Sequence, residues 1–415
     1  MGAYLERIDA APETERWRLV RGFIFKHQLP FFEELRRERP ILILPELTIT
    51  SRFVDCSVIL RRHQTFSVDL YKPKQGGYFM AQDDTAVHWR EKSIMKAILD
   101  REDIPNIRAW VRANTKERLV AGGGNVDIVP AITRGVPIGL VQEWFGLSGA
   151  DPDKLKEWSY WNQQDAFWNQ PFDSVARTDQ DAVIGKREAA NVEMAFYLGK
   201  LVARRKLALI FWSSAQDPVS RLLRLAASGA LKFSIKDVVF NVGGLLIGAV
   251  ETTSHACVNA LRFLLEDPLR RQAAISAALS DDTNHFDGFV FEALRFRPAF
   301  PYFFRTCKKD TPLAVGTVHE TVVGTGTTVL ALTHSAMFDG ATFAQPDQFD
   351  PNRDLTETFT FGQGLHQCLG IAIARAMVPE IVRQTLRTGN LRFEGDPDFK
   401  AGSVPESWQL KYDPT

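Results

Sequence analysis

Residues 359–370, FTFGQGLHQCLG, place one thiol, Cys368, between a glycine-rich loop and LGIAIARAM, a run of helical composition. A thiolate is a strong, soft ligand for iron, and a helix start favours the anionic form through its dipole and its free N–H groups. Gly362, Gly364 and Gly370 would let the backbone approach a flat ligand closely. The stretch therefore predicts an iron ligand, whereas an isolated cysteine is usually just a buried small side chain.

Composition narrows the classes of partner. Fifty basic and fifty acidic residues cancel, and no long basic run is present, which argues against binding to nucleic acid or anionic lipid. The other cysteines lie far apart with no CxxC pair, which argues against a disulfide framework or a zinc knuckle. The N-terminus lacks the apolar core of a secretory signal, and the most apolar stretch, 238–250, is too short to cross a bilayer. We expect a cytoplasmic protein with no membrane or nucleic-acid partner.

The pattern along the chain indicates the elements that must position this thiol. Helical periodicity dominates from about residue 85 to 300, and residues 311–333 have the Val, Thr and Gly spacing of small antiparallel strands. Residues 31–51 predict a short helix that stops at Pro40, followed by two short strands. No repeat or linker is visible. The prediction is one domain, residues 1–415, mainly α with a small β part.

The clearest single helix covers residues 234–265. Ser234 and Asp237 have the spacing of a capping box, and Glu266, Asp267 and Pro268 mark the end of the helix. Because its residues are mostly apolar, this helix must be buried nearly all round. We expect it to run through the middle of the protein.

Within this helix, the sequence GAVETT combines an alcohol and an acid. The hydroxyl of Thr252 can donate to the carbonyl of Gly248, four residues back, which bends a helix and opens a groove. Glu251 would place a titratable carboxyl beside the groove. On their own, such residues are more often tolerated in a kinked buried helix, although a buried carboxylate requires a partner.

A second polar pair lies between the long helix and the cysteine loop. Glu292 and Arg295 are three residues apart in FEALRFRP and share a helix face, where they can form an ion pair. The spacing alone is weak, because Glu33 and Arg36 share it. We interpret the pair as scaffold.

Residues Phe361, Gly364, Cys368 and Gly370 fit FxxGxxxCxG, and this stretch resembles the haem-ligand loop of the cytochrome P450 family. GAVETT resembles the family's oxygen-activation signature with its two small residues in reversed order. Glu292 and Arg295 stand where the family has its ExxR pair, and Arg353 resembles the residue that completes that network. The resemblance extends over most of the chain, from about residue 85 to 380.

The resemblance implies a cytochrome P450-type helical domain with the long helix over haem b. Cys368 would be the axial ligand of the iron, in a loop that contains Phe361 and Gly362. The haem propionates would meet His88, Lys92, Arg305 and His366, with Lys92 standing where the family usually has arginine. A lysine cannot pair bidentately with a carboxylate. Pro379, in the helix after the cysteine, should kink or distort that helix.

The activity implied is insertion of one oxygen atom from dioxygen into a small or medium apolar substrate. Thr252 would hold dioxygen and a water molecule, and Glu251 would supply protons. Electrons would come from a separate ferredoxin-type donor and its reductase. Two alternatives stay open: a peroxide-driven or non-oxygenating enzyme of the same haem-thiolate type, and a non-catalytic haem sensor.

The sequence gives the least information about which residues line the substrate pocket. Its predicted lining comes from the loop near residue 79, the long helix, the FPYF segment and a turn at 404–408; the candidates are Phe79, Leu245, Ala249, Phe300, Pro301 and Tyr302. The aromatic segment 158–172 has Trp161 and Trp168 seven apart on one helix face. It could roof an apolar pocket, or simply pack in the core.

Overall fold

The computed structural model describes residues 2–83, 85–99, 101–211, 215–229, 232–400 and 402–414. Helices predominate, as the sequence predicts, and their bounds are α1 Ala3–Ala10, α2 Glu13–Lys26, α3 Gln28–Glu38, α4 Phe53–Arg61, α5 Lys72–Gln75, α6 Ala86–Ile98, α7 Ile104–Ala121, α8 Gly135–Glu143, α9 Pro152–Trp168, α10 Gln180–Phe211, α11 Pro218–Ser228, α12 Ile235–Glu266, α13 Pro268–Leu279, α14 Thr283–Phe296, α15 Thr333–Ala336 and α16 Ile371–Leu386. Short 3₁₀ turns join some of them: η1 Asp69–Tyr71, η2 Phe79–Ala81, η4 Pro171–Val175 and η5 Gly364–His366. A π-helical turn, η3 Val129–Thr133, precedes α8.

The strands form small sheets. Their bounds are β1 Ile41–Ile43, β2 Thr48–Thr50, β3 Phe66–Ser67, β4 Asn125–Asp127, β5 Phe303–Cys307, β6 Thr311–Leu313, β7 Thr321–Val323, β8 Thr328–Ala331, β9 Arg392–Asp398 and β10 Ser407–Lys411. The largest sheet has the order β1-β2-β8-β5-β3, and β4-β10-β9 and β6-β7 form two others. The antiparallel strands predicted over 311–333 are confirmed, because β6 pairs with β7 and β8 pairs with β5 in this direction. On its other edge β8 runs parallel to β2, which lies far away in sequence, so no hairpin fixes that direction.

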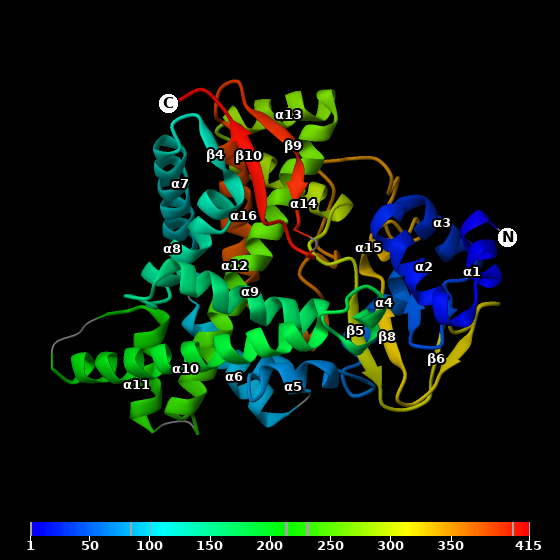
Figure 1. Cartoon of the computed structure of the whole chain (residues 1–415), viewed down its shortest axis with the longest axis horizontal. Coiled ribbons are helices and arrows are strands. Elements are labelled where there is room, and N and C mark those ends of the chain that lie inside the picture. The colour runs from blue at the N-terminus through cyan, green and yellow to red at the C-terminus, as the bar shows by residue number, and fades with distance from the viewer. Residues whose placement is uncertain are drawn as a thin grey trace.

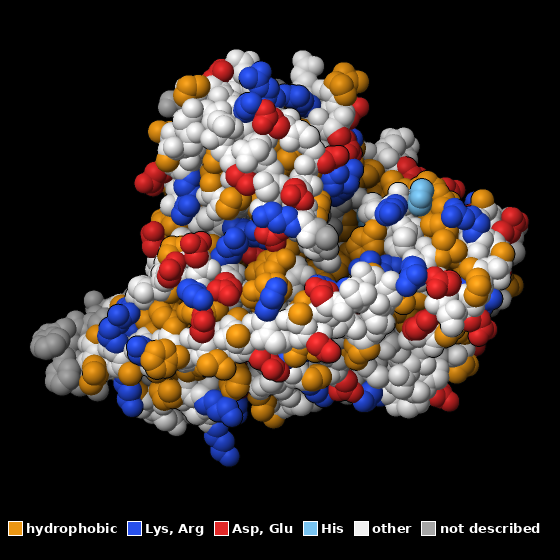
Figure 2. All heavy atoms as spheres, in the orientation of Figure 1, with side chains coloured by type: hydrophobic (Ala, Val, Ile, Leu, Met, Phe, Trp, Pro, Cys, Tyr) orange, Lys and Arg blue, Asp and Glu red, His pale blue; other side chains and the backbone are white. Residues whose placement is uncertain are grey.

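Two sides of the molecule can be followed in Figure 1. The N-terminal helices and the five-stranded sheet lie at the right, and the larger helical part lies at the left, where α9 and α10 run side by side. On the face in Figure 2, acidic and basic side chains are interspersed without a large area of one sign. No helix of the described residues is long and apolar enough to cross a membrane. The cytoplasmic location stays a prediction.

Helix α12 has the predicted position and ends. The Ser234 hydroxyl accepts from the Asp237 N–H, and the Asp237 carboxylate accepts from the Ser234 N–H, so the capping box is confirmed. Helix α12 packs against α8, α9, α14 and α16. Its buried residues contribute to the largest core cluster. It is therefore the element around which the helical part is assembled.

Pro379 lies inside α16, yet the helix continues through it to Leu386. Proline has no N–H, so the carbonyl of Arg375 lacks its usual helical donor. The Arg108 guanidinium of α7 donates to that carbonyl at 3.2 Å and also pairs with Asp287 of α14. Arg108 thus connects α7 with α14 and α16, and it supplies a donor for the carbonyl that Pro379 leaves without one.

Candidate functional site

In the middle of α12, residues 241–260, one residue alone is exposed. Gly248 is exposed, and Ala249 and Thr252 are partly exposed, whereas Leu246, Val250 and Glu251 are buried. A Cβ atom placed on Gly248 would meet nothing within 4 Å. This face of the helix therefore borders open space.

The predicted contact in GAVETT is present. Thr252 Oγ1 donates to the Gly248 carbonyl at 2.5 Å. Side chains of α9 take the two preceding carbonyls: Ser159 Oγ lies 3.5 Å from the Leu246 oxygen, and Gln163 Nε2 donates to the Ile247 oxygen at 2.6 Å. Three successive carbonyls of α12 thus accept hydrogen bonds from side chains.

Glu251 is buried on another side of α12, where it meets a buried arginine. Arg134 Nε donates to Glu251 Oε2 at 2.9 Å. The same guanidinium reaches Glu406 Oε2 at 2.8 Å, in the segment before β10. Arg134 is the residue between the π-helical turn η3 and α8, and π-helical turns in proteins often mark functional positions. We call Glu251, Arg134 and Glu406 the Arg134 bridge.

The pKa of Glu251 responds to opposing influences. Burial raises it, Arg134 lowers it, and the charge of Glu406 raises it again. Glu251 Oε1 is buried without a hydrogen-bond partner. The carboxyl can therefore take a proton at Oε1 without losing its contacts to Arg134.

The cysteine loop closes on itself before α16. The Cys368 N–H donates to the Phe361 carbonyl at 2.9 Å. Gly362 and Gly364 have φ of +66° and +72°, and a Cβ on Gly364 would lie 2.4 Å from the Leu60 carbonyl oxygen, so these two glycines are required. Gly370 has ordinary dihedral angles, and a Cβ atom there would meet nothing within 4 Å, so neither backbone strain nor crowding requires glycine at this position.

Cys368 is partly exposed as a residue. Burial raises its pKa, and the Gly370 N–H and the Lys92 ammonium lower it. The thiols of Cys56 and Cys257 are fully buried, and desolvation alone dominates their raised pKa. Of these three cysteines, only Cys368 combines partial exposure with groups that favour the anion, as iron ligation needs.

The four residues predicted to meet the propionates lie close together, and we call them the cation cluster: His88, Lys92, Arg305 and His366. The rings of His88 and His366 are 5.0 Å apart. Burial, followed by the charges of Arg305, His88 and Lys92, lowers the pKa of His366 to about 2. Lys92 Nζ donates to the carbonyls of Leu365 and Gln367, within the loop.

The cation cluster has no acid of its own. Among the described residues, no carboxylate forms an ion pair with any of its members. His88 Nε2 and both ring nitrogens of His366 are buried without partners. Buried charges such as those of Lys92 and Arg305 are costly without a carboxylate partner, so the residues present fit an anionic group.

The predicted scaffold behind the loop is assembled as expected. Arg295 donates to Glu292 through Nε at 2.9 Å and Nη2 at 2.7 Å, and both side chains are fully buried. Arg353 Nε donates to the same carboxylate at 3.0 Å. Arg295 also reaches the Met337 carbonyl, which ties α14 to the chain after α15.

The predicted substrate residues do not form one group. Leu245 packs in the core cluster of α12, and Ala249 is partly exposed beside Gly248. Phe300 stacks on Trp168 with ring centres 5.7 Å apart, which links the FPYF segment to the end of α9. These three stay candidates for the pocket.

Phe79, Pro301 and Tyr302 are buried, and Phe79 lies in the same core cluster as the buried Leu245, so it stays a candidate as well. The Phe79 carbonyl accepts from His88 Nδ1, and the Pro301 carbonyl accepts from the His334 N–H. Tyr302 packs with the N-terminal helices, in a different core cluster from Leu245. The structure therefore does not bring Tyr302 together with the groove, because strand β5 starts immediately after it and the chain alternates sides there.

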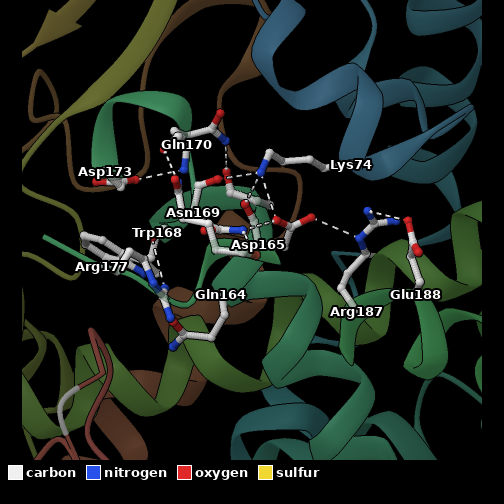
Figure 3. Close-up of polar contacts among 12 residues, drawn as sticks. Lys74, Gln164, Asp165, Trp168, Asn169, Gln170, Asp173, Arg177, Arg187 and Glu188 are labelled. Carbon is white, nitrogen blue, oxygen red and sulfur yellow. Dashed lines mark hydrogen bonds and ion pairs between the residues drawn. The ribbon is translucent and has the colours of Figure 1, made fainter. Parts of the chain in front are cut away.

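A polar cluster fastens the end of the aromatic segment (Figure 3). Asp165, almost fully buried, accepts from Lys74 of α5 at 2.9 Å and from Arg187 of α10 at 3.0 Å. Lys74 also donates to the carbonyls of Asp165 and Asn169, at the C-terminal end of α9. These contacts join α5, α9 and α10, and α9 in turn packs against α12.

Sequence reasoning missed Arg134, Ser159 and Gln163. A signal existed for Arg134, which is the only charge in the apolar run IVPAITRGVPIGLV and had to be buried with a partner. No comparable signal distinguished Ser159 and Gln163 among the polar residues of the aromatic segment.

Comparison with known proteins agrees with this geometry. Residues 212–402 match the family model described as Cytochrome P450. The chain is 27% identical over 331 residues to erythromycin C-12 hydroxylase of Saccharopolyspora erythraea, which covers 78% of this chain and 77% of the relative. It is also 27% identical over 350 residues to cytochrome P450 107B1 of the same organism, covering 81% and 75% of the two chains.

The fold is likewise similar to solved structures. The ligand-free crystal structure of Mycobacterium smegmatis CYP164A2 superposes with a TM-score of 0.78 at 21% identity, covering 96% of this chain and all of that one. At such an identity the likeness shows the fold, while the sequence relatives carry the family assignment. The chain therefore belongs to the cytochrome P450 family and is an oxidoreductase of its haem-thiolate monooxygenase type.

Proposed function

We propose that this protein inserts one oxygen atom from dioxygen into a small or medium apolar organic substrate. The observation that carries the proposal is the accessible face of α12, where Thr252 bonds to the Gly248 carbonyl beside a buried carboxyl. The family's bound haem supplies a redox-active iron whose thiolate ligand favours O–O cleavage. We further propose that residues 1–415 are one domain, a view supported by the pairing of β10 with β4.

The haem is proposed to be haem b, held without covalent attachment. The chain contains no CxxCH sequence of the kind that attaches haem covalently. Cys368 would hold the iron, and the cation cluster would pair with the propionates. Phe361 and Gly362 would form the loop against the macrocycle.

Residues of α12 and α9 would position the groups on the side of the haem where dioxygen is proposed to bind. The Thr252 hydroxyl donates a hydrogen bond to the Gly248 carbonyl, so its oxygen is left to accept a hydrogen bond from a water molecule. Ser159 and Gln163 hold the neighbouring carbonyls and keep this arrangement fixed. Glu251 can hold a proton at Oε1 and release it toward the groove.

The substrate is proposed to be apolar because the candidate residues beside the groove are Leu245, Ala249 and Phe300. Electrons are proposed to come from a separate ferredoxin-type donor with its reductase. The relatives named as a hydroxylase and an epoxidase support oxygen insertion as the reaction type.

Thr252→Ala tests the proposal, with the buried neighbour Thr253→Ser as the matched control. With a surrogate ferredoxin and reductase and an apolar ligand that shifts the haem spectrum, Thr252→Ala should still bind the ligand. It should divert most electrons to hydrogen peroxide, whereas the control should couple as the unmodified protein does.

Unchanged coupling in Thr252→Ala would remove the threonine from the mechanism. Product formed with hydrogen peroxide alone, and none with dioxygen and the reductase, would instead establish the peroxide-driven alternative.

A further inference from the structure

The Arg134 bridge joins the proposed proton donor to the C-terminal part of the chain. Arg134 Nε and Nη2 lie 2.9 and 2.8 Å from Glu251 Oε2. Nη1 and Nη2 donate to the two oxygens of Glu406 at 2.8 and 3.1 Å, and Nη2 reaches the Pro405 carbonyl at 3.1 Å. A single buried guanidinium thus serves two carboxylates on opposite sides.

The burial of the three side chains is graded. Arg134 and Glu251 are 1% and 2% exposed, and Glu406 is 12% exposed. Glu406 is therefore the end of the bridge that meets water. Two carboxylates and one guanidinium give the bridge a formal charge of −1, so Glu251 shares the positive charge of Arg134 with Glu406.

Other titratable groups around Glu251 act more weakly. Lys156 of α9 attracts its charge, and Tyr160 of α9 has a pKa raised by burial and by Glu406. Burial, followed by the charge of Arg134, lowers the pKa of His255, one turn along α12, to about 4, so this ring is neutral near pH 7. Arg134 and Glu406 are left as the two charges that oppose each other.

We propose that Arg134 and Glu406 are positioning residues with opposite effects on Glu251. Arg134 stabilises Glu251 as a carboxylate. Glu406 competes for the charge of Arg134, so that Glu251 can take a proton. The proposal rests on the function proposed for Glu251 in proton supply. The proton comes from solvent water, binds at the unpartnered Oε1 and leaves toward the groove. Arg134 keeps its charge throughout.

The opposing roles predict pH shifts of opposite sign. Without Arg134, Glu251 keeps its burial and loses its attraction, so its midpoint of protonation should rise by about 1 to 3 pH units. Without the charge of Glu406, the arginine turns fully to Glu251, and the midpoint should fall by about 1 pH unit. A structural role alone would not give the two variants opposite signs.

Infrared titration of the carboxyl C=O band of Glu251 measures these midpoints directly. The full-length haem-loaded protein would carry ¹³C-labelled glutamate, and subtraction of the same background with Glu251→Gln would assign the band. Arg134→Met should shift the midpoint up and Glu406→Gln should shift it down. The controls Arg118→Met, a partly buried arginine that donates to the Ala131 carbonyl, and Glu394→Gln, a half-exposed acid paired with Lys411, should leave it in place.

Arg134→Lys and Glu406→Gln keep the test decisive if Arg134→Met does not fold. A lysine keeps the positive charge but cannot donate to two carboxylates with the planar geometry of a guanidinium. The midpoint of Glu251 in Arg134→Lys should therefore lie between those in the unmodified protein and in Arg134→Met. Unmoved midpoints, or shifts of one sign in both variants, would overturn the proposal. If the midpoints move as expected while the pH profile of coupling stays unchanged, the positioning roles stand and Glu251 is not the proton supplier.

Discussion

The Arg134 bridge and the cation cluster are both buried groups of charges, and they differ in balance. In the bridge each nitrogen of the guanidinium donates to an oxygen of the same chain. In the cation cluster, two histidines, a lysine and an arginine lie together, and buried ring nitrogens lack partners. The bridge supplies carboxylate partners for its own arginine, whereas the cation cluster supplies none and therefore indicates an anionic ligand.

Loss of an arginine should therefore have different costs at the two places. In haem-free protein, Arg134→Met leaves Glu251 buried and unpaired, which should lower the free energy of unfolding by about 3–5 kcal/mol. Urea unfolding measures this value, with Arg118→Met as control. A loss of the same size for Arg305→Met in haem-free protein would contradict the contrast, since no carboxylate of the described residues forms an ion pair with Arg305.

A buried histidine outside both groups provides a pH reference. His334 Nε2 donates to the Phe296 carbonyl, and burial lowers the pKa of His334 to about 3. The unfolded chain therefore binds this proton first, and stability should be lost as the pH falls from about 6.5, by about 1.4 kcal/mol for each pH unit. Urea unfolding at several pH values should show that His334→Gln reduces the slope by one proton. An unchanged slope would contradict the neutral buried state.

Arg305→Met should mainly weaken haem retention. Its guanidinium is the permanent charge of the cation cluster, and a lost charge-assisted hydrogen bond costs about 1.5–3 kcal/mol, which corresponds to about 10-fold to 150-fold in affinity. Haem transfer to an acceptor protein measures the loss. Arg297→Met, a partly exposed arginine paired with Glu266, is the control and should retain haem normally. Equal retention in both variants would remove Arg305 from the propionate site.

Lys92→Arg should have the smallest effect. An arginine can pair bidentately with a carboxylate, so haem release should slow by a few fold, worth less than about 1 kcal/mol. Lys96→Arg, on the exposed face of the same helix, should change nothing. Faster haem release from Lys92→Arg would show that the lysine's contacts to the loop carbonyls matter more than the propionate.

Local features were predictable from the sequence. The capping box of α12, the Thr252 hydrogen bond and the Glu292–Arg295 pair depend on residues three or four apart, whose geometry a helix fixes. The cysteine loop was recognisable because its glycines follow a specific spacing. Family membership followed from the order of these features along the chain.

Long-range features were not predictable. Arg134 and Glu251 are 117 residues apart, and periodicity does not say which buried carboxylate meets which arginine. The same limit applies to the parallel pairing of β2 with β8, and to Arg108 meeting the carbonyl that Pro379 leaves free. Tyr302 was expected at the pocket because a sequence segment does not reveal which of its side chains faces the groove.

The central claim is that Cys368 holds a haem iron as a thiolate, and the spectrum of the reduced carbon monoxide complex tests it most directly. The unmodified protein should show the Soret band of thiolate-ligated haem, and Cys368→Ser should lose that band, while Cys257→Ser should keep it. Identical spectra from the unmodified protein and Cys368→Ser would contradict the account.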